Sequence, residues 1–268
     1  MVKDFSYRIY RHLVTELQQS GYQFQTFESF LNEPLARTVM IRHDIDVSAK
    51  AALPFMRIEH ELGLKASYYF RTLKGTYKPS IFREAVGLGH ELGYHYEDLA
   101  RNAGDMDKAV SDFKRNLAMF RQHYPVQTVC MHGSSGSQFD NRDMWKTSSF
   151  SEHGLLGEPY VSLDFNKVLY LSDTSKRWNG SAFALRDKVE SSFQFSFTTT
   201  WDILKYIDKL PNQIMLTIHP EYWADDFVGR AKVNLFVLVH SYYKKYYRNS
   251  RSRRKALNSQ QKLASKDG

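Results

Sequence analysis

Short apolar runs alternate with helix-like segments along most of the chain, and this alternation constrains the fold more than any other feature. The runs with the composition of buried strands are 38–41, 66–70, 91–96, 126–131 and 214–218. The helical patterns between or before them are 49–62, 79–88, 105–122 and 201–209. Parallel strands need a long crossover, usually a helix, between one strand and the next. We therefore expect an α/β protein with a predominantly parallel sheet or barrel.

A single catalytic-type α/β barrel domain is expected over residues 1–240, because no linker divides them. Apolar residues recur every four positions over 4–20, which predicts an N-terminal helix packed on the barrel. The stretch 134–200 is less regular, and we expect short strands there at 159–165 and 168–172.

The positive charge of the chain is confined to its C-terminal end. The formal net charge is +8, and residues 241–268 alone hold nine basic side chains and one acidic one, so residues 1–240 are neutral. We therefore expect no nucleic-acid partner. A long helix is predicted over 223–247, with its first half packed on the barrel, and the tail beyond it is predicted to be disordered. The tail is either a solvated end or a peripheral contact with an anionic membrane surface.

The cysteine content and hydropathy indicate the compartment. Cys130 is the single cysteine, which excludes an internal disulfide and fits a reducing environment. No run of 18 apolar residues is present, and the first residues lack the pattern of a signal peptide. We expect a cytoplasmic location.

Acidic and imidazole side chains stand where four predicted strands end. They are Asp44, Asp46, His95, His132 and His219. The carboxyl ends of the strands of a parallel barrel share one face, so these groups are expected to converge. A buried carboxylate or imidazole costs free energy unless it is paired or bound to a metal. The pattern therefore predicts a metal-assisted or acid–base site on that face.

The pair Asp44-x-Asp46 has two interpretations. Alternation along a strand points both side chains to the same face, where two carboxylates repel each other unless a cation or a proton separates them. One metal ligand and one general base satisfy this requirement. Alternatively, Asp46 is an N-cap of the following helix.

Three segments carry a resemblance to a known family. They are RHDID at 42–46, GHELGYH at 89–95 and TIHP at 217–220. In order and spacing the chain resembles the polysaccharide deacetylase family with the NodB-homology fold (carbohydrate esterase family 4). It is most similar to a divergent branch with an RHDVD-type first motif, often associated with surface-polysaccharide synthesis. The resemblance covers about residues 38–223 and implies a distorted (β/α) barrel with predominantly parallel strands.

The resemblance also implies an activity and a set of roles. The activity is metal-dependent hydrolysis of a carbon–nitrogen bond other than a peptide bond, removing an acyl group, most simply acetyl, from an amino sugar or related carbohydrate. The metal is usually zinc. By position, Asp44 matches the catalytic base and His219 the general acid, while Asp46 and His95 match metal ligands. A metal-dependent amidase acting on a non-sugar substrate is a further alternative.

Two positions depart from the family pattern. The second metal-binding histidine of the second motif is replaced by Leu99, and the Arg-Pro of the third motif corresponds to Met131-His132-Gly133. We expect His132 to supply the missing ligand, with Glu97 as the alternative third ligand. If neither does, the chain is a catalytically inactive carbohydrate-binding or scaffold protein on the same barrel.

Four further residues are candidate substrate contacts. Asn141 follows a glycine- and serine-rich loop that we expect over the barrel mouth, where it either binds sugar hydroxyls or belongs to a turn with a helix cap. Asp173 and Trp178 loosely resemble the fourth motif of the family, and Trp178 is expected to stack on a sugar. Arg186 is expected beside the catalytic base. The alternatives are surface ion pairs and a packed aromatic ring. His43 is expected to turn away from the pocket, and His90 to be structural.

Overall fold

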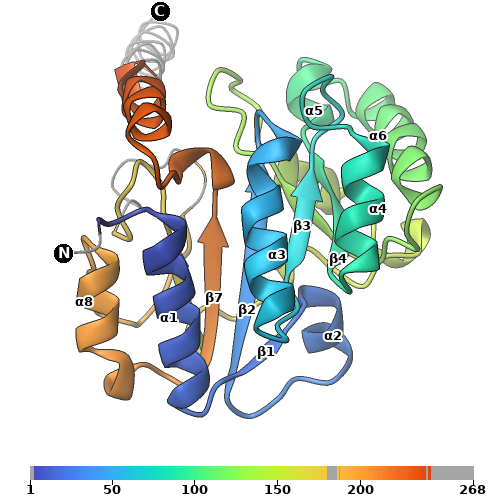
Figure 1. Cartoon of the computed structure of the whole chain (residues 1–268). Coiled ribbons are helices and arrows are strands. Elements are labelled where there is room, and N and C mark those ends of the chain that lie inside the picture. Colours follow the sequence, from blue (N-terminus) through green and yellow to red (C-terminus); the bar gives the residue numbers. More distant parts are fainter. Residues whose placement is uncertain (1–2, 180–185, 187, 240, 243–268) are drawn as a thin grey trace, which may run out of the picture.

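The computed structural model describes residues 3–179, 186, 188–239 and 241–242. The strands of this part are β1 (Gln23–Gln25), β2 (Thr38–Ile45), β3 (Ser67–Phe70), β4 (Glu91–Tyr96), β5 (Val129–Met131), β6 (Val168–Ser172) and β7 (Gln213–Ile218). They form one sheet in the order β5-β4-β3-β2-β7-β6, with β1 paired to the start of β2. Every pairing is parallel. The sheet curves into a half-barrel with helices around it, which confirms the expected α/β barrel class (Figure 1).

Helices surround this sheet (Figure 1). The α-helices are α1 (Tyr7–Gln19), α2 (Phe27–Asn32), α3 (Leu53–Glu61), α4 (Pro79–Gly87), α5 (Asp98–Arg101), α6 (Met106–Arg121), α7 (Pro159–Ser162) and α8 (Thr200–Lys205). Short 3₁₀ segments are η1 (Ala49–Ala52), η2 (Asn141–Lys146), η3 (Ser151–His153), η5 (Ile207–Lys209) and η6 (Pro220–Tyr222). The predicted N-terminal helix begins only at Tyr7, because the hydroxyl of Ser6 caps it by accepting from the amide of Ile9.

Side chains of β2 alternate between two environments. On the outward face, Val39, Ile41 and Ile45 pack into the main core beneath the helices. His43, on the same face, contacts the buried carboxylate of Glu59. The opposite face carries Met40, Arg42 and Asp44 in sequence order, from the start of the strand to its end. Met40 belongs to a second, smaller core inside the half-barrel. The interior therefore changes from apolar to charged along the strand direction.

The helix α2 closes the apolar end of the interior. Phe27 and Phe30 of this helix pack with Tyr69, Met215 and their neighbours on the inner face of the sheet. Tyr69 fits there because Gly93 lies beside it: a Cβ on Gly93 would come within 2.3 Å of the Tyr69 ring. The opposite end of the interior, at the carboxyl ends of the strands, is left for polar groups.

Several predicted elements need correction. Residues 159–165 begin as a helix rather than a strand, because Pro159 follows Glu158, whose carboxylate accepts from the Val161 amide as a helix cap. The predicted strand 168–172 is confirmed as β6. The sequence patterns also missed β1, α2 and α5, each of which is at most six residues long.

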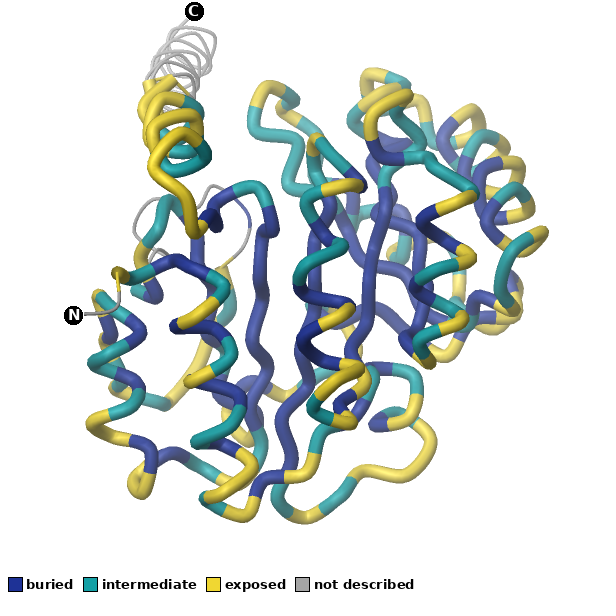
Figure 2. Tube along the Cα trace, viewed as in Figure 1, coloured by how far each residue is buried: buried dark blue, intermediate teal, exposed yellow. Residues whose placement is uncertain are grey.

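The C-terminal helix also differs from its prediction. Among the described residues it comprises 227–239 and 241–242, and residues 223–226 lie outside it. Most of its side chains are exposed, and Phe236 and Val237 are the apolar residues of this helix that pack against the main core, so the expected packing on the barrel is found only in part (Figure 2). The tail from 243 to 268 lies outside the described residues. Within the described part, none of the helices combines the length and the apolar character needed to cross a bilayer.

Candidate active site

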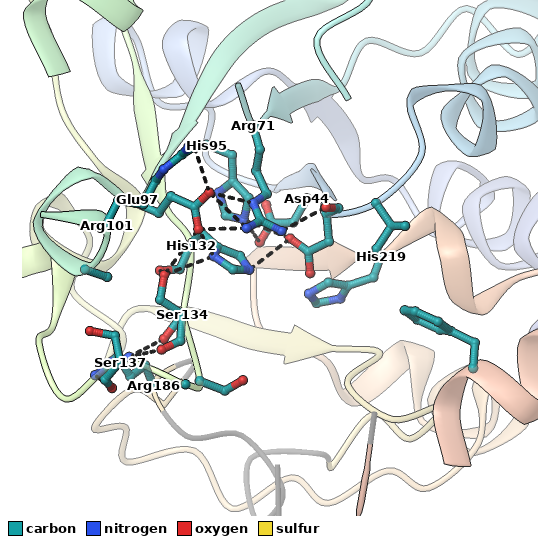
Figure 3. Close-up of a pocket in the computed structure, with 17 residues that line it drawn as sticks. Asp44, Arg71, His95, Glu97, Arg101, His132, Ser134, Ser137, Arg186 and His219 are labelled. Atoms are coloured by element: carbon teal, nitrogen blue, oxygen red, sulfur yellow. Dashed lines mark hydrogen bonds and ion pairs between the residues drawn. The ribbon is translucent and has the colours of Figure 1, made fainter. Parts of the chain in front are cut away.

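A cavity of about 480 Å³ opens at the carboxyl ends of the strands. The polar side chains that line it include Asp44, Asp46, Arg71, His95, Glu97, Arg101, His132, Arg186 and His219. Each of the five residues expected from the strand-end pattern is thus present, together with Glu97. Figure 3 labels all of these except Asp46. They meet because β2, β4, β5 and β7 are parallel, so their last inward-facing residues project to the same end.

Asp46 lies between two imidazoles. Its Oδ1 atom is 3.4 Å from Nε2 of His95 and 3.5 Å from Nε2 of His132. This oxygen is buried and has no hydrogen-bond partner among the described residues. Burial alone would raise the pKa of Asp46, but His132 and His95 lower it well below its usual range. Ligand atoms around a tetrahedral zinc ion are about 3.3 Å apart, given bonds of about 2.0 to 2.1 Å. The unsatisfied carboxylate and its two neighbours therefore fit a divalent cation.

Both imidazoles are fixed by their other nitrogen. Nδ1 of His95 donates to the carbonyl oxygen of Cys130 at 3.0 Å, and Nδ1 of His132 donates to Oε2 of Glu97 at 3.0 Å. With Nδ1 of each ring engaged in this way, Nε2 is the nitrogen that can bind a cation beside Asp46. Glu97 in turn accepts hydrogen bonds from Nε and Nη2 of Arg71. Glu97, the alternative third ligand, thus orients His132 instead.

The charge on Glu97 is stabilised in this position. Burial raises the pKa of its carboxyl group, but the hydrogen bond from His132 and the charge of Arg71 outweigh burial and lower it to about 2. Arg71 also donates to the backbone carbonyl of Asp46 at 2.9 Å. The same guanidinium therefore positions groups on both sides of the candidate metal site.

Asp44 is paired with a buried arginine on its own strand. Nη2 of Arg42 donates to Oδ2 of Asp44 at 2.8 Å and to the hydroxyl of Tyr160 at 2.7 Å. The guanidinium also stacks on the Tyr160 ring at 4.7 Å from its centroid. Burial opposes the charge of Arg42, but Asp44 outweighs this and the pKa of Arg42 is raised well above its usual value. Arg42 takes the place beside the candidate base that was expected for Arg186.

A second set of possible ligands shares this region. Asp44, His95 and Cys130 offer ligand atoms within 4.8 Å of one another. A cation at that point would lie beside the positive charge of Arg42, which already neutralises Asp44. Cys130 is fully buried and is not among the residues that line the cavity. The set centred on Asp46 is therefore the better candidate.

His219 enters the cavity from the end of β7 and is fixed by Asp173. Its Nδ1 donates to Oδ1 of Asp173 at 2.6 Å, and its backbone amide also donates to this carboxylate. Burial lowers the pKa of His219, but Asp173 more than compensates, with smaller contributions from Asp46 and Asp44, and raises it to about 10. The imidazole therefore carries a proton at neutral pH and can donate it to a bound molecule.

Three candidate substrate contacts are buried instead, which corrects their assignment. Asp173 is fully buried, and Trp223 donates to its second oxygen. Trp178 packs against Phe5, and its indole N–H donates to Thr200. Asn141 donates to the carbonyl oxygen of His132, so it positions the loop that carries this histidine. Their local sequences did not show that these side chains face inward.

Arg186 lines the cavity but binds the loop over its mouth. Its guanidinium donates to the carbonyl oxygens of Gly133, Ser134 and Ser137. It therefore contacts the loop rather than the candidate base.

The sequence analysis missed Arg71. Position at the end of a strand, the signal that identified the other site residues, applies to it as well, because Arg71 directly follows β3. His43 and His90 lie outside the cavity as expected: His43 contacts Glu59, and His90 contacts the carbonyl of Met56.

Comparison with known proteins gives likenesses in structure. No protein-family model and no curated protein sequence matches the chain. A CE4 esterase from Streptococcus mutans is 17% identical with a TM-score of 0.43, covering 87% of this chain and 91% of that one. A peptidoglycan deacetylase from Bacillus subtilis is 9% identical with a TM-score of 0.44, covering 85% and 98%. A CE4 family pseudoenzyme from Bacillus anthracis is 10% identical with a TM-score of 0.42, covering 79% and 66%. These similar structures come from carbohydrate esterase family 4, the family that the three sequence motifs resemble.

Proposed function

We propose that this chain is a metal-dependent hydrolase that removes an acyl group, most simply acetyl, from the nitrogen of an amino sugar or related carbohydrate. The observation that carries the proposal is the buried, unsatisfied oxygen of Asp46 between the fixed imidazoles of His95 and His132. The carbohydrate substrate and a role in surface-polysaccharide metabolism come from the motif resemblance. The single cysteine, Cys130, supports a cytoplasmic location.

The residues divide the chemistry between them. Asp46, His95 and His132 would hold the metal, and one carboxylate with two imidazoles is a donor set that suits zinc. A bound zinc ion lowers the pKa of water and polarises the acyl oxygen. Asp44, fixed by Arg42, accepts the proton of the attacking water. His219 donates its proton to the leaving amine, so that this amine departs uncharged rather than as an anion.

The metal content of the purified protein tests the first part of the proposal. We expect about one zinc ion per chain, measured by elemental mass spectrometry on protein prepared without chelator. His95→Ala and His132→Ala should both lose most of this zinc. Cys130→Ala is the matched control and should keep it, because Cys130 lies outside the cavity. If His132→Ala kept the zinc and Cys130→Ala lost it, the metal would instead be bound by Asp44, His95 and Cys130.

The role of Asp44 is tested separately. Asp44→Asn should keep the zinc but lose turnover of acetylated amino sugars by about 100-fold or more, because the amide cannot accept the water proton. Unchanged turnover in this variant would remove Asp44 from the mechanism. A complete absence of bound metal in the parent protein would instead favour the inactive carbohydrate-binding alternative. Leu99 gives that alternative its support, because it packs in the core, where the family pattern has a ligand.

A further inference from the structure

The C-terminal helix carries an exposed apolar stripe. Its members are Val228, Leu235, Leu238, Val239 and Tyr242, which are between 54% and 68% exposed. Val228 and Leu235 are seven residues apart, Leu238 and Val239 lie three and four residues after Leu235, and Tyr242 lies three residues after Val239. These spacings place all five along one side of a helix. Contiguous exposed apolar groups of this kind mark interaction sites, because a solvated surface gains nothing from them.

The base of this helix is attached to the body of the protein. The ring of Phe236 packs on Tyr222 at 6.1 Å between centroids and forms part of the cavity wall. Arg230 donates to the carbonyl of Asp4, and Lys176 donates to the side chain of Asn234. The stripe therefore belongs to a helix that the fold holds in place beside the cavity mouth.

Charge is distributed unevenly along this part of the chain. Asp225 and Asp226 precede the helix, whereas residues 241–268 carry nine basic side chains and one acidic one. Along the sequence, the stripe is followed by three more tyrosines, at positions 243, 246 and 247. Aromatic rings followed by basic side chains are typical of segments that lie at the boundary between lipid and water. A second copy of this chain would bring the same positive charge and would be repelled by it.

We propose that the exposed stripe and the basic segment after it bind the surface of a membrane that contains anionic lipids. The apolar side chains enter the boundary between headgroups and acyl chains, and the basic side chains neutralise lipid phosphates. The helix rises beyond the carboxyl ends of the strands, on the same end of the molecule as the cavity (Figure 1). Binding in this way holds the end of the protein that carries the cavity close to the membrane (Figure 1).

Co-sedimentation with lipid vesicles tests this proposal on the full chain. The protein should sediment with vesicles of phosphatidylglycerol and phosphatidylcholine, and much less with phosphatidylcholine alone. The double variant Leu238→Glu/Val239→Glu should bind the anionic vesicles at least about tenfold more weakly, since burying a single Leu is worth about that factor. Replacing Arg251, Arg253, Arg254 and Lys255 by Gln should abolish the preference for the anionic vesicles.

A matched variant controls for the change in charge. Leu156→Glu/Val161→Glu makes the same two substitutions at exposed positions elsewhere, and it should bind like the parent protein. Circular dichroism should show all variants folded. Undiminished binding by Leu238→Glu/Val239→Glu would overturn the proposal. So would a stable dimer, detected by light scattering, that this variant dissociates, because the stripe would then be an interface between two copies.

Discussion

His219, which lines the cavity, is paired with the fully buried Asp173 behind it. Asp173 accepts from the ring and the backbone amide of His219, and from the indole of Trp223. Three donors on a fully buried carboxylate leave it little freedom to turn. The direction of the His219 ring is therefore set by a residue that the sequence suggested only as a substrate contact.

Replacing this carboxylate tests its role. Asp173→Asn removes the negative charge that holds the proton on His219, so the pKa of His219 should fall from about 10 toward that of an ordinary histidine. Turnover should fall by about 100-fold or more while bound zinc is unchanged. Proton NMR titration of the ring and steady-state kinetics measure the two effects. Trp223→Phe removes only one donor to Asp173 and should lower turnover less. An unaltered rate in Asp173→Asn would contradict the role of Asp173 in holding the proton on His219.

The carboxyl group of Asp98, directly after Glu97, should make the stability of the folded protein depend on pH. Burial raises the pKa of its carboxyl group to about 6, although hydrogen bonds from Tyr94 and Asn116 oppose this. A folded-state pKa above the unfolded value means that the folded protein binds the proton more tightly. This tighter binding adds to the free energy of unfolding at a pH below the pKa that Asp98 has in the unfolded chain. The added stability is lost as the pH rises through about 6, the pKa of Asp98 in the folded protein.

The expected consequence is measurable by urea denaturation. Between about pH 4 and pH 7, the parent protein should lose about 2 to 3 kcal/mol of unfolding free energy relative to Asp98→Asn. The variant keeps an acceptor for Tyr94 but has no titrating group. Parallel pH profiles for the two proteins would show that Asp98 is not responsible.

At the scale of elements, α1 and α3 are joined by two contacts of different kinds. Inside the core, Tyr10 of α1 donates to Glu59 of α3, which also accepts from Tyr68 and contacts His43. At the surface, Arg11 of α1 pairs with Glu61 of α3. Removing Glu59 leaves several buried polar groups without a partner, whereas removing Glu61 returns Arg11 to water.

The two contacts should therefore differ greatly in their contribution to stability. Glu59→Leu should lower the free energy of unfolding by about 3 to 5 kcal/mol. Glu61→Ala, the control on the same helix, should change it by less than about 1 kcal/mol. Urea denaturation followed by tryptophan fluorescence compares them. Equal losses in the two variants would mean that the buried network contributes no more than a surface ion pair.

The individual helices and strands differ in how well the sequence predicted them. Long periodic segments such as α6 and apolar runs such as β4 were recognised because their own pattern matches their environment. The helix α7 was not, since its single turn depends on Glu158, whose carboxylate also accepts from the amide of Met131 in a distant strand. Short elements of this kind are set by tertiary contacts, which a local pattern does not contain.

For the whole molecule, the strand direction organises the interior. The inner face runs from the apolar end under α2, through Arg42 and Asp44, to Asp46 at the cavity. This rule explains why strand-end residues were predicted to meet. It also explains why Asn141 and Trp178 were misplaced, because they lie in the irregular stretch 134–200, where no strand fixes the direction of a side chain.

The two ends of the interior should therefore be separable by mutation. Phe27→Ala removes a fully buried ring from the closed end and should lower the free energy of unfolding by about 3 to 5 kcal/mol. Zinc content at moderate temperature should be unchanged, because the candidate ligands lie at the opposite end of β2 and its neighbours. Phe227→Ala makes the same chemical change at a residue that is 82% exposed and should leave the stability as it is. Loss of zinc from folded Phe27→Ala, measured by elemental mass spectrometry, would show instead that the apolar end helps to hold the site in shape.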